Sequence, residues 1–546
     1  RDYSYAPPRN GQRPPTPIPF RLSPHPNLLE KEPNNSLVES TPGERTHAFC
    51  GVISETDDED WFEFAAVEGE SIDIEVYARR VRSSLDPSIA IFDAEGKLVA
   101  SNDDGGKVTD HSDAEERGVD CFLRFKPPAT ASYYIRINDI LHTGSPTHVY
   151  RIECTPTVPW MLIRLPRVQD PNELYGQYRQ QIFVARGNRF AALARARTRD
   201  FSGRLKLEFP QLPEGVSYET QNIPAGTTGF PIVFTAAEDA PLGGGLYPVR
   251  GSHENEEKEI EGGYYNYADL LRAKENLSLL KTRIVEKVPI VVTDTIPFTL
   301  EADIPETPLV RSGIWKLKVT AVREPGFDSP IRLTMPFLPP GVATSSGEVI
   351  PAGETDAEFT LTAHPMITPR DWKIYVQGVS GEDNDWMWAS TQMVPLHIKK
   401  GYASLKLSPA QVVAGDKGFL SCEIETIEPF TEEAVIEVSG LPEHVVSADV
   451  TVKPGQTNVQ IPLTIDSSAS VGSHGGVLAS LRVASGNRFV VSQFGPTTLK
   501  ITEVSGSTGE KDAAETADPP ARSLSRLEQL RLDAKNRQAD RSEGSG

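Results

Sequence analysis

Two short acidic clusters near the beginning of the chain contain side chains that could bind a hard cation. The first supplies the oxygen atoms of Glu30, Glu32, Asn34 and Asn35, and the second, at 57–60, has the sequence DDED. Ca²⁺ binds about six to eight oxygen ligands from carboxylates, amides and carbonyls. The residue types therefore predict a calcium site, with Asp57 and Asp60 as its contribution from the second cluster.

The segment between the two clusters must fold back if they are to share one ion. It contains the apolar stretch THAFCGVI at 46–53, which is typical of a β-strand. The clusters lie at opposite ends of this segment, so sequence spacing alone does not bring them together.

Other chemistry has little support in the sequence. The ten histidines are scattered, and the chain has no His-Glu-x-x-His pair, no Gly-x-Ser-x-Gly elbow, no phosphate loop and no dinucleotide fingerprint. The acidic loop at Asn102–Asp104 is a weaker candidate for a second cation site. We therefore expect no enzyme in this chain.

Composition excludes further classes of protein. The 546 residues carry a net charge of −21, whereas binding to nucleic acid needs a basic surface that displaces counterions. No apolar run approaches the roughly 20 residues needed to span a bilayer. At about 150 residues per domain, the length predicts three or four domains. The chain begins at Arg1 with no signal segment, so we expect a processed or partial chain.

From about residue 46, apolar and polar residues alternate as they do in half-buried strands. SIDIEVYA at 71–78 and SYYIRIND at 132–139 are two of about eight such segments before residue 154. This pattern predicts an all-β fold that begins with an antiparallel sandwich. The preceding residues 1–29 are rich in proline, which cannot donate ladder hydrogen bonds, and are predicted to form an extended linker.

The rest of the chain repeats one pattern three times. LPEGVSYETQNIPAG at 212–226 recurs as LPPGVATSSGEVIPAG at 338–353 and as LPEHVVSADVTVKPG at 441–455, each copy between two alternating segments. Such spacing is typical of immunoglobulin-like (Ig-like) sandwiches. We expect three of them, at 156–296, 297–400 and 401–503.

Two segments fall outside the repeat. A polar insertion at about 251–281 reads as a surface loop, with a short helix around 268–277 as the alternative. Residues 504–546 have the composition of a disordered tail. Leu524, Leu527 and Leu530 recur there at helical spacing, which leaves a short partner-binding helix as an alternative.

The four cysteines do not reveal the compartment. Cys121 and Cys154 fall on the apolar faces of predicted strands, where a buried thiol is common. A disulfide between two of Cys50, Cys121 and Cys154 is the alternative, since an exported chain permits one.

The order of motifs over residues 30–155 resembles the bacterial pre-peptidase C-terminal (PPC) domain. The resemblance rests on segments in the expected order: EPNN at 32–35, GVI at 51–53, DDEDWFEF at 57–64, LDP at 85–87 and the NDD loop at 102–104. It covers just over a fifth of the chain and implies a PPC-type antiparallel sandwich. The three later domains resemble Ig-like domains found beside PPC domains in large exported bacterial proteins.

The resemblance also implies a ligand set for calcium. In relatives that serve as collagen-binding modules, the entry segment and the turn before the second strand ligate the ion together. Carried over by motif, the ligands are Glu30, Glu32, Asn34, Asn35, Asp57 and Asp60, with the carbonyl of Trp61 as a further ligand. Collagen binding itself is not carried over, because no matching surface motif is present.

PPC domains are exported, non-catalytic appendages, which gives the functional expectation. We expect a protein outside the cell, in the periplasm or on the cell surface, whose calcium-stabilised PPC domain and Ig-like spacers bind or present an unknown protein or polymer. The alternative is the accessory region of a secreted peptidase or other hydrolase whose catalytic domain precedes residue 1. A third hypothesis makes the PPC domain a targeting module that stacks Tyr77 and Tyr134 on a polymer.

Overall fold

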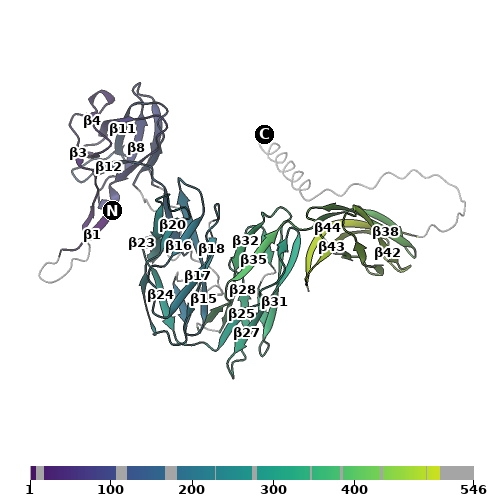
Figure 1. The fold of residues 1–546 in the computed structure, drawn as a ribbon. Helices are drawn as coiled ribbons and strands as arrows, with labels where there is room; N and C mark the ends of the chain where they lie inside the picture. Colours follow the sequence, from purple (N-terminus) through teal and green to yellow (C-terminus); the bar gives the residue numbers. More distant parts are fainter. Residues whose placement is uncertain are drawn as a thin grey trace, which may run out of the picture.

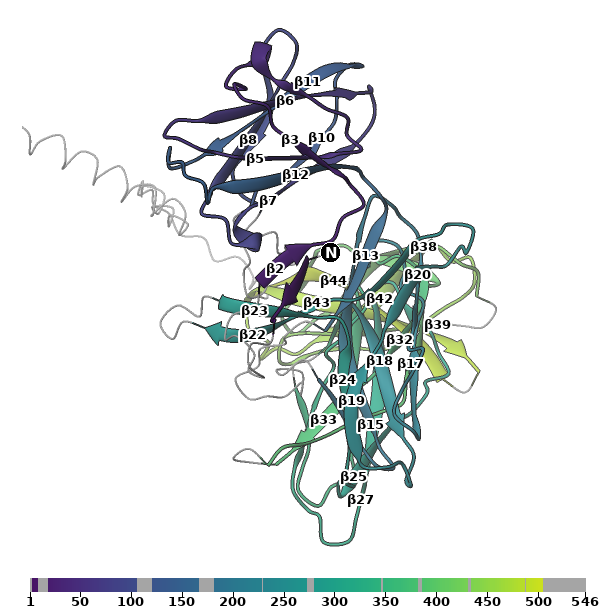
Figure 2. The same cartoon turned by 90° about the vertical axis from the view of Figure 1, so that its left-hand side faces the viewer.

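The chain folds almost entirely into β-strands. The computed structural model describes residues 2–7, 18–105, 120–165, 181–227, 229–272, 279–344, 347–381, 385–430, 434–486 and 488–503. Within these ranges the helical segments are two short 3₁₀ turns, η1 (Leu37–Glu39) and η2 (Arg79–Val81). The predicted all-β sandwich fold is confirmed, because the strands form sheets that are layered against one another (Figures 1 and 2). Alternating apolar residues of these layers form the hydrophobic cores.

The first domain packs two five-stranded sheets around one hydrophobic core. Its centre is aromatic, with Phe49 stacked on Phe62 and Phe125 edge-on to Tyr133. One sheet has the order β10 (Phe122–Phe125), β7 (Ile72–Tyr77), β12 (Val149–Pro156), β5 (Ala48–Val52) and β3 (Asn27–Leu29). The other has the order β4 (Thr41–Pro42), β6 (Glu59–Ala66), β11 (Ala131–Asp139), β8 (Pro87–Phe92) and β9 (Leu98–Asn102).

The N-terminal segment is not the linker that its prolines predict. Strands β1 (Asp2–Tyr5) and β2 (Ile18–Arg21) form a two-stranded ribbon, and β3 then joins the first domain in parallel with β5. Pro19 is tolerated because a two-stranded ribbon leaves one edge of each strand unpaired. Arg21 anchors the ribbon: its guanidinium donates two hydrogen bonds to Glu153, at 2.9 and 2.6 Å, and lies 3.6 Å from the ring centroid of Tyr77.

The second domain combines a seven-stranded and a three-stranded sheet. The larger has the order β16 (Leu205–Glu208), β20 (Arg250–His253), β21 (Glu261–Tyr264), β13 (Trp160–Arg164), β15 (Arg189–Arg199), β18 (Gly229–Ala236) and β17 (Val216–Thr220). The smaller has the order β14 (Ile182–Ala185), β24 (Val288–Thr293) and β19 (Gly243–Tyr247), and a separate hairpin pairs β22 (Asn266–Arg272) with β23 (Leu279–Val285).

The polar insertion at 251–281 differs from both predictions. Strands β20 and β21 belong to the seven-stranded sheet, so this part of the insertion is not a surface loop. The helix predicted around 268–277 is wrong over the described residues 268–272, which lie in strand β22. Pairing with the next strand overrides the weak helical spacing there.

The third and fourth domains share one continuous sheet. Its main path is β29 (Val342–Thr344), β31 (Asp356–Ala363), β27 (Gly313–Arg323), β44 (Arg488–Thr502), β43 (Gly472–Ser485), β39 (Ala434–Ser439) and β41 (Val450–Val452), with β25 (Phe298–Ala302) on β27 and β37 (Ala410–Val413) on β44. The third domain adds β26 (Leu309–Val310), β35 (Val394–Lys399) and β32 (Arg370–Ile374), and β30 (Glu348–Ile350), β28 (Ile331–Thr334), β33 (Gln377–Ser380) and β34 (Met387–Ser390). The fourth adds β36 (Ala403–Leu407), β38 (Lys417–Thr426), β42 (Asn458–Ile465) and β40 (Val445–Ser447).

Neighbouring domains are also joined by packing. Ala191 and Val233 of the second domain belong to the hydrophobic core of the third. Asn188 donates a buried 2.8 Å hydrogen bond to the carbonyl of Phe298 across this boundary. The first domain meets the second through ion pairs, including one of 2.8 Å between Arg124 and Asp200.

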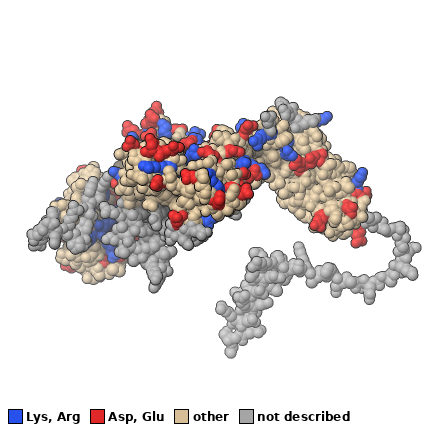
Figure 3. Space-filling view, turned by 90° about the horizontal axis from the view of Figure 1, so that it is seen from below, with Lys and Arg blue, Asp and Glu red and all other residues tan. Residues whose placement is uncertain are grey.

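All four cysteines are free thiols, so the disulfide left as an alternative by the sequence is not formed in the structure. Cys121, Cys154 and Cys422 are buried, and Cys50 is half-buried. On the face shown in Figure 3, acidic and basic side chains are mingled. No helix among the described residues is long and apolar enough to cross a membrane.

Candidate metal centre

The entry segment of the first domain folds back onto the start of β6. After β3, the backbone N–H of Glu30 donates to the carbonyl of Cys50 at 3.0 Å, and the N–H of Lys31 donates to Thr41 Oγ1 at 3.0 Å. The N–H of Trp61 then donates to the carbonyl of Asn34 at 3.0 Å. These hydrogen bonds bring the two acidic clusters of the sequence side by side.

Three carboxylates converge at this crossing. One oxygen each from Glu32, Asp58 and Asp60 lies within 4.8 Å of the others, and Asp58 and Asp60 are buried. Like charges so close repel one another strongly where water is excluded. Protons, hydrogen-bond donors or a cation can relieve this repulsion.

The two asparagine amides show how the cluster could accept a cation. With its oxygen turned inward, the Asn34 amide faces only acceptors; turned over, its nitrogen donates to Asp60 Oδ1 at 3.1 Å and to Glu32 Oε2 at 2.9 Å. The Asn35 nitrogen in its turned orientation donates to Asp58 Oδ1 and to the carbonyl of Glu59, both at 3.0 Å. A 180° rotation of each amide thus converts a donor into an inward-facing oxygen ligand.

Asp60 is the most perturbed member of the cluster. Burial raises its pKa to about 9; a hydrogen bond from Tyr150 opposes the rise and the neighbouring Glu30 adds to it. Tyr150 Oη lies 2.6 Å from Asp60 Oδ2 and 2.9 Å from Glu30 Oε2. Burial also raises the pKa of Glu32. A cation beside Asp60 would offset this cost of burying its charge.

The donor set fits a hard cation. Glu32, Asn34, Asn35, Asp58 and Asp60 together offer carboxylate and amide oxygens, with the Glu59 carbonyl beside them. Oxygen ligands of this kind suit Ca²⁺, and no soft nitrogen or sulfur ligand belongs to the cluster. Asn34 is completely buried, which leaves its amide no water to bind.

The structure places Glu30 one layer behind the cluster. Its carboxylate accepts hydrogen bonds from the backbone N–H of Val52, at 3.0 and 3.2 Å, and from Tyr150. Glu30 and Asp60 both contact the Tyr150 hydroxyl, and both carboxylate oxygens of Glu30 already accept hydrogen bonds.

Asp57 does not join the cluster, which corrects the predicted ligand set. Its φ of 60° turns it away, and its side chain is 73% exposed and lies 3.0 Å from His142. Asp58 takes its place. Strand periodicity gave a signal for this, because residues 58 and 60 share one face of an extended segment whereas residues 57 and 60 do not.

Trp61 contributes differently from the prediction. Its backbone N–H holds the entry segment through Asn34, and its ring packs against Phe92 with the centroids 4.8 Å apart. The carbonyl beside the Asn35 amide belongs to Glu59. Glu59 lies two residues before Trp61, and residues two apart on a strand face the same way, so the carbonyl beside the cluster can be that of Glu59 in place of Trp61.

The other predicted candidates have structural partners. Asn102 donates to the carbonyl of Phe122 at 2.6 Å and accepts from the N–H of Asp104, so its amide is engaged in the loop. Tyr77 is 3% exposed and lies between Arg21 and Arg80, which is incompatible with stacking on a polymer. The tail at 504–546 lies outside the described residues.

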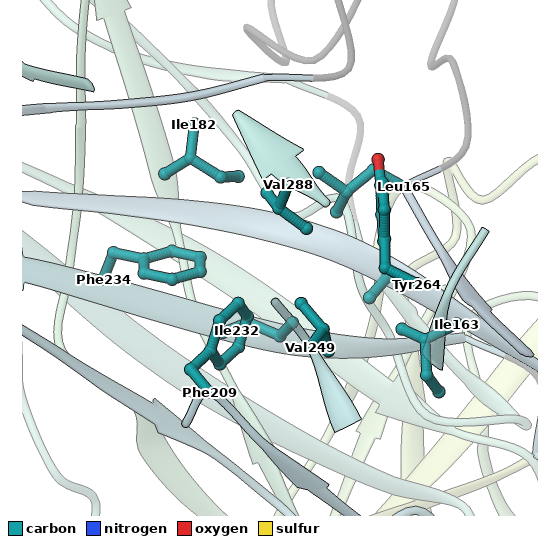
Figure 4. A pocket seen from close by; sticks show the side chains of 10 residues that line it. Ile163, Leu165, Ile182, Phe209, Ile232, Phe234, Val249, Tyr264 and Val288 are labelled. Atoms are coloured by element: carbon teal, nitrogen blue, oxygen red, sulfur yellow. The ribbon is translucent and has the colours of Figure 1, made fainter. Parts of the chain in front are cut away.

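A small void lies among the described residues of the second domain. The void has a volume of ≈ 10 Å³ and is lined by apolar and aromatic side chains that converge in Figure 4, including Ile163, Phe234 and Tyr264. A void so small and apolar is expected to remain dry.

Comparisons with known proteins add no functional assignment. No protein-family model matches the chain. No curated protein matches it either.

Several solved structures share a distant likeness with the chain. A protein of unknown function from Porphyromonas gingivalis W83 is 13% identical, with 37% of this chain and 99% of that chain covered and a TM-score of 0.15. The native conformation of E. coli alpha-2-macroglobulin is 9% identical, with 79% and 28% covered and a TM-score of 0.16, so this chain spans little more than a quarter of that protein. The fibronectin(III)-like modules of Clostridium thermocellum CbhA are 14% identical, with 40% and 90% covered and a TM-score of 0.13. TM-scores this low carry no argument about function.

Proposed function

We propose that the chain is a non-catalytic, multidomain protein of the extracellular space or cell surface. In this proposal the first domain is a PPC-type module stabilised by Ca²⁺, and the three following domains are Ig-like spacers that bind or present a ligand. The order of motifs over residues 30–155 supports the PPC assignment. The role of calcium is supported by the cation cluster, which consists of Glu32, Asn34, Asn35, Asp58 and Asp60.

The observation that carries the proposal is the convergence of oxygen atoms where the entry segment crosses β6. Glu32, Asn34 and Asn35 come from the entry segment, and Asp58 and Asp60 come from the turn and strand that follow. An ion held by both sides would fix the entry segment to the sandwich. Its contribution would be stability, with no reaction step attached to it.

The junctions between the later domains support a spacer role. Strand β44 of the fourth domain pairs with β27 of the third at Gly313 and Ile314, so the two domains share backbone hydrogen bonds. The second and third domains share a hydrophobic core. Domains joined in this way keep a fixed spacing, which suits presentation of a ligand away from an anchor.

Calorimetry of the full chain tests the calcium site. We expect Ca²⁺ to raise the midpoint of the first domain's thermal transition, because the complete ligand set exists only in the folded state. At a free Ca²⁺ concentration of 100 times Kd, the stabilisation would be about 2.7 kcal/mol. EDTA should reverse the shift, and Mg²⁺, which prefers a smaller octahedral site, should produce a smaller one. A midpoint that does not move between micromolar and 10-millimolar Ca²⁺, a range of about four orders of magnitude in concentration, would refute the site.

A further inference from the structure

The three later domains contain the same turn, and the fourth domain has histidine where the other two have glycine. The turn begins LPEGV at 212–216, LPPGV at 338–342 and LPEHV at 441–445. Its fourth residue has a left-handed backbone in every copy, with φ of 73° at Gly215, 87° at Gly341 and 67° at His444. Glycine adopts this conformation freely, whereas a histidine there is strained.

A second turn packs against the first in each domain. The carbonyl of Gly215 accepts a hydrogen bond from the N–H of Ala237 at 2.8 Å, and that of Gly341 accepts one from His364 at 2.8 Å. The carbonyl of His444 accepts the corresponding bond from Asp466 at 2.9 Å. One position is the residue whose carbonyl accepts this bond, and the other is the residue whose N–H donates it. Of the three copies, the fourth domain alone has ionisable side chains at both positions, namely His444 and Asp466.

These two side chains line an open groove of ≈ 480 Å³ at one end of the fourth domain. Ser467, Thr464 and Val446 contribute to the same groove. A groove this open would contact one side of an extended ligand and would not enclose a small molecule. Strained residues of this kind cluster at functional sites, because a strained conformation persists only where something retains it.

The polar end of the groove has free hydrogen-bonding capacity. Asp466 Oδ1 accepts from the N–H and the hydroxyl of Ser468, at 2.9 and 2.7 Å, and among the described residues no donor to Asp466 Oδ2 is found. The ring of His444 is exposed beside it and can donate or accept. The groove therefore offers a carboxylate acceptor, an imidazole and hydroxyl groups together.

Two exposed apolar side chains lie on the face of the sheet β36-β38-β42-β40 that adjoins the groove. Val446 is 63% exposed and lies directly across from Thr464. Phe419 is 60% exposed and lies directly across from Pro462. Pro462 and Thr464 are two residues apart in β42. Thr464 and Pro462 point to the same face of β42, so Val446 and Phe419 also lie on one face of the sheet, on opposite sides of β42.

We propose that this groove and the adjoining sheet face bind a neutral oligosaccharide. Sugar hydroxyls donate to carboxylates and accept from imidazole, and the C–H faces of sugar rings pack on exposed aromatic and aliphatic side chains. The free carboxylate oxygen of Asp466 disfavours acidic sugars, since it would face their carboxylates or sulfates. The site lies in the fourth domain and does not depend on the cation cluster of the first.

Titration of the full chain with four neutral probes tests the proposal: maltohexaose, cellohexaose, xylohexaose and N-acetylchitohexaose. We expect saturable binding of at least one, measured by calorimetry or ligand-observed NMR. His444→Gly restores the residue of the sister turns, so it should fold, raise the thermal midpoint of the fourth domain, and weaken binding by about tenfold or more. Phe419→Ala should weaken binding as well.

His474→Ala provides the matched control, because it changes a histidine of the same domain outside the groove and should leave binding unchanged. Absence of saturable binding to all four probes would overturn the proposal. So would binding that is unaffected by both His444→Gly and Phe419→Ala, or binding of alginate oligosaccharides alone, which are acidic. None of these results would alter the response of the first domain to Ca²⁺.

Discussion

At the residue scale, the proposed cation site depends on the directions in which the acidic side chains around the start of β6 point. Asp58 lies on the same face as Asp60 and is buried, whereas Asp57 has a left-handed backbone and points to solvent. Two neighbouring residues with the same side chain therefore have different environments, which makes the pair a matched comparison for the proposed site.

Asp58→Asn should abolish or strongly reduce the calcium response, because it removes a buried charge from the ligand set. A tenfold loss of affinity would lower the stabilisation at a fixed Ca²⁺ concentration by about 1.4 kcal/mol. Calorimetric titration of the full chain measures this change. Asp57→Asn should leave the response intact. Loss of the response in Asp57→Asn and its retention in Asp58→Asn would mean that the ion binds elsewhere.

Arg21 and Glu153 give the N-terminal ribbon a stability that depends on pH. Burial alone would raise the pKa of Glu153, but hydrogen bonds from Arg21 and Arg151 lower it to about 2. A lowered carboxyl pKa stabilises the fold above its unfolded value of about 4.5, and this contribution disappears as the pH falls toward 2.

Arg21→Met should therefore cost about 1.5–3 kcal/mol at neutral pH, the value of a hydrogen-bonded charge pair. Urea unfolding at a series of pH values measures the cost. The difference from the unmodified protein should shrink below about pH 4.5, as Glu153 becomes protonated. A difference that stays constant from pH 7 to pH 2 would assign the loss to packing on Tyr77 instead.

At the element scale, the loop between β11 and β12 supports the turn that carries Asp58. The N–H of Ser145 donates to the carbonyl of Ile53 at 2.9 Å, and the N–H of Ile53 donates to the carbonyl of His148 at 3.1 Å. Gly144 lies so close to Glu55 that a Cβ there would be 2.0 Å from the Glu55 carbonyl oxygen. The turn and the loop therefore hold each other in place.

Gly144→Ala should destabilise the first domain by about 1–3 kcal/mol, because backbone atoms must move to admit the methyl group. It should also weaken the calcium response, since the turn carrying Asp58 would shift. Thermal unfolding with and without Ca²⁺ measures both effects. Gly475→Ala is the control, because a Cβ there would meet no atom within 4 Å. Unchanged stability in Gly144→Ala would contradict the close packing of loop and turn.

At the scale of the whole molecule, the second and third domains are packed against each other. Asn188 is 4% exposed and its amide reaches the Phe298 carbonyl across the boundary. Phe183 and Trp388 also meet there, with ring centroids 4.9 Å apart. A boundary this apolar and well bonded is expected to unfold cooperatively with both domains.

Asn188→Ala should lower the stability of both domains together, by about 1–3 kcal/mol, because it leaves a buried carbonyl without its donor. Differential scanning calorimetry should show one transition for the pair moving to lower temperature. Asn458→Ala, which changes an exposed residue of the fourth domain, should leave that transition in place. Two transitions that respond separately would show that the domains are independent.

Much of the fold follows from local pattern. Alternation in segments such as 71–78 and 132–139 predicted strands β7 and β11, since burial of one face needs only a period of two. The errors lie where pairing with a distant strand decides the outcome. Strands β2 and β22 are examples. Proline content argued against a strand at β2, and helical spacing argued for a helix at β22, but each segment pairs with another strand.

The sequence by itself determined the chemistry of the proposed cation site, because the carboxylates and amides of the entry segment and around the start of β6 are hard oxygen ligands wherever they lie. Only the tertiary structure decided which of them meet. The fold-back of the entry segment selected Asp58 over Asp57 and placed Glu30 behind Asp60, through hydrogen bonds between residues far apart in sequence. Long-range contacts of this kind leave no periodic signal in the chain, so composition and spacing could propose the ligands but not their geometry.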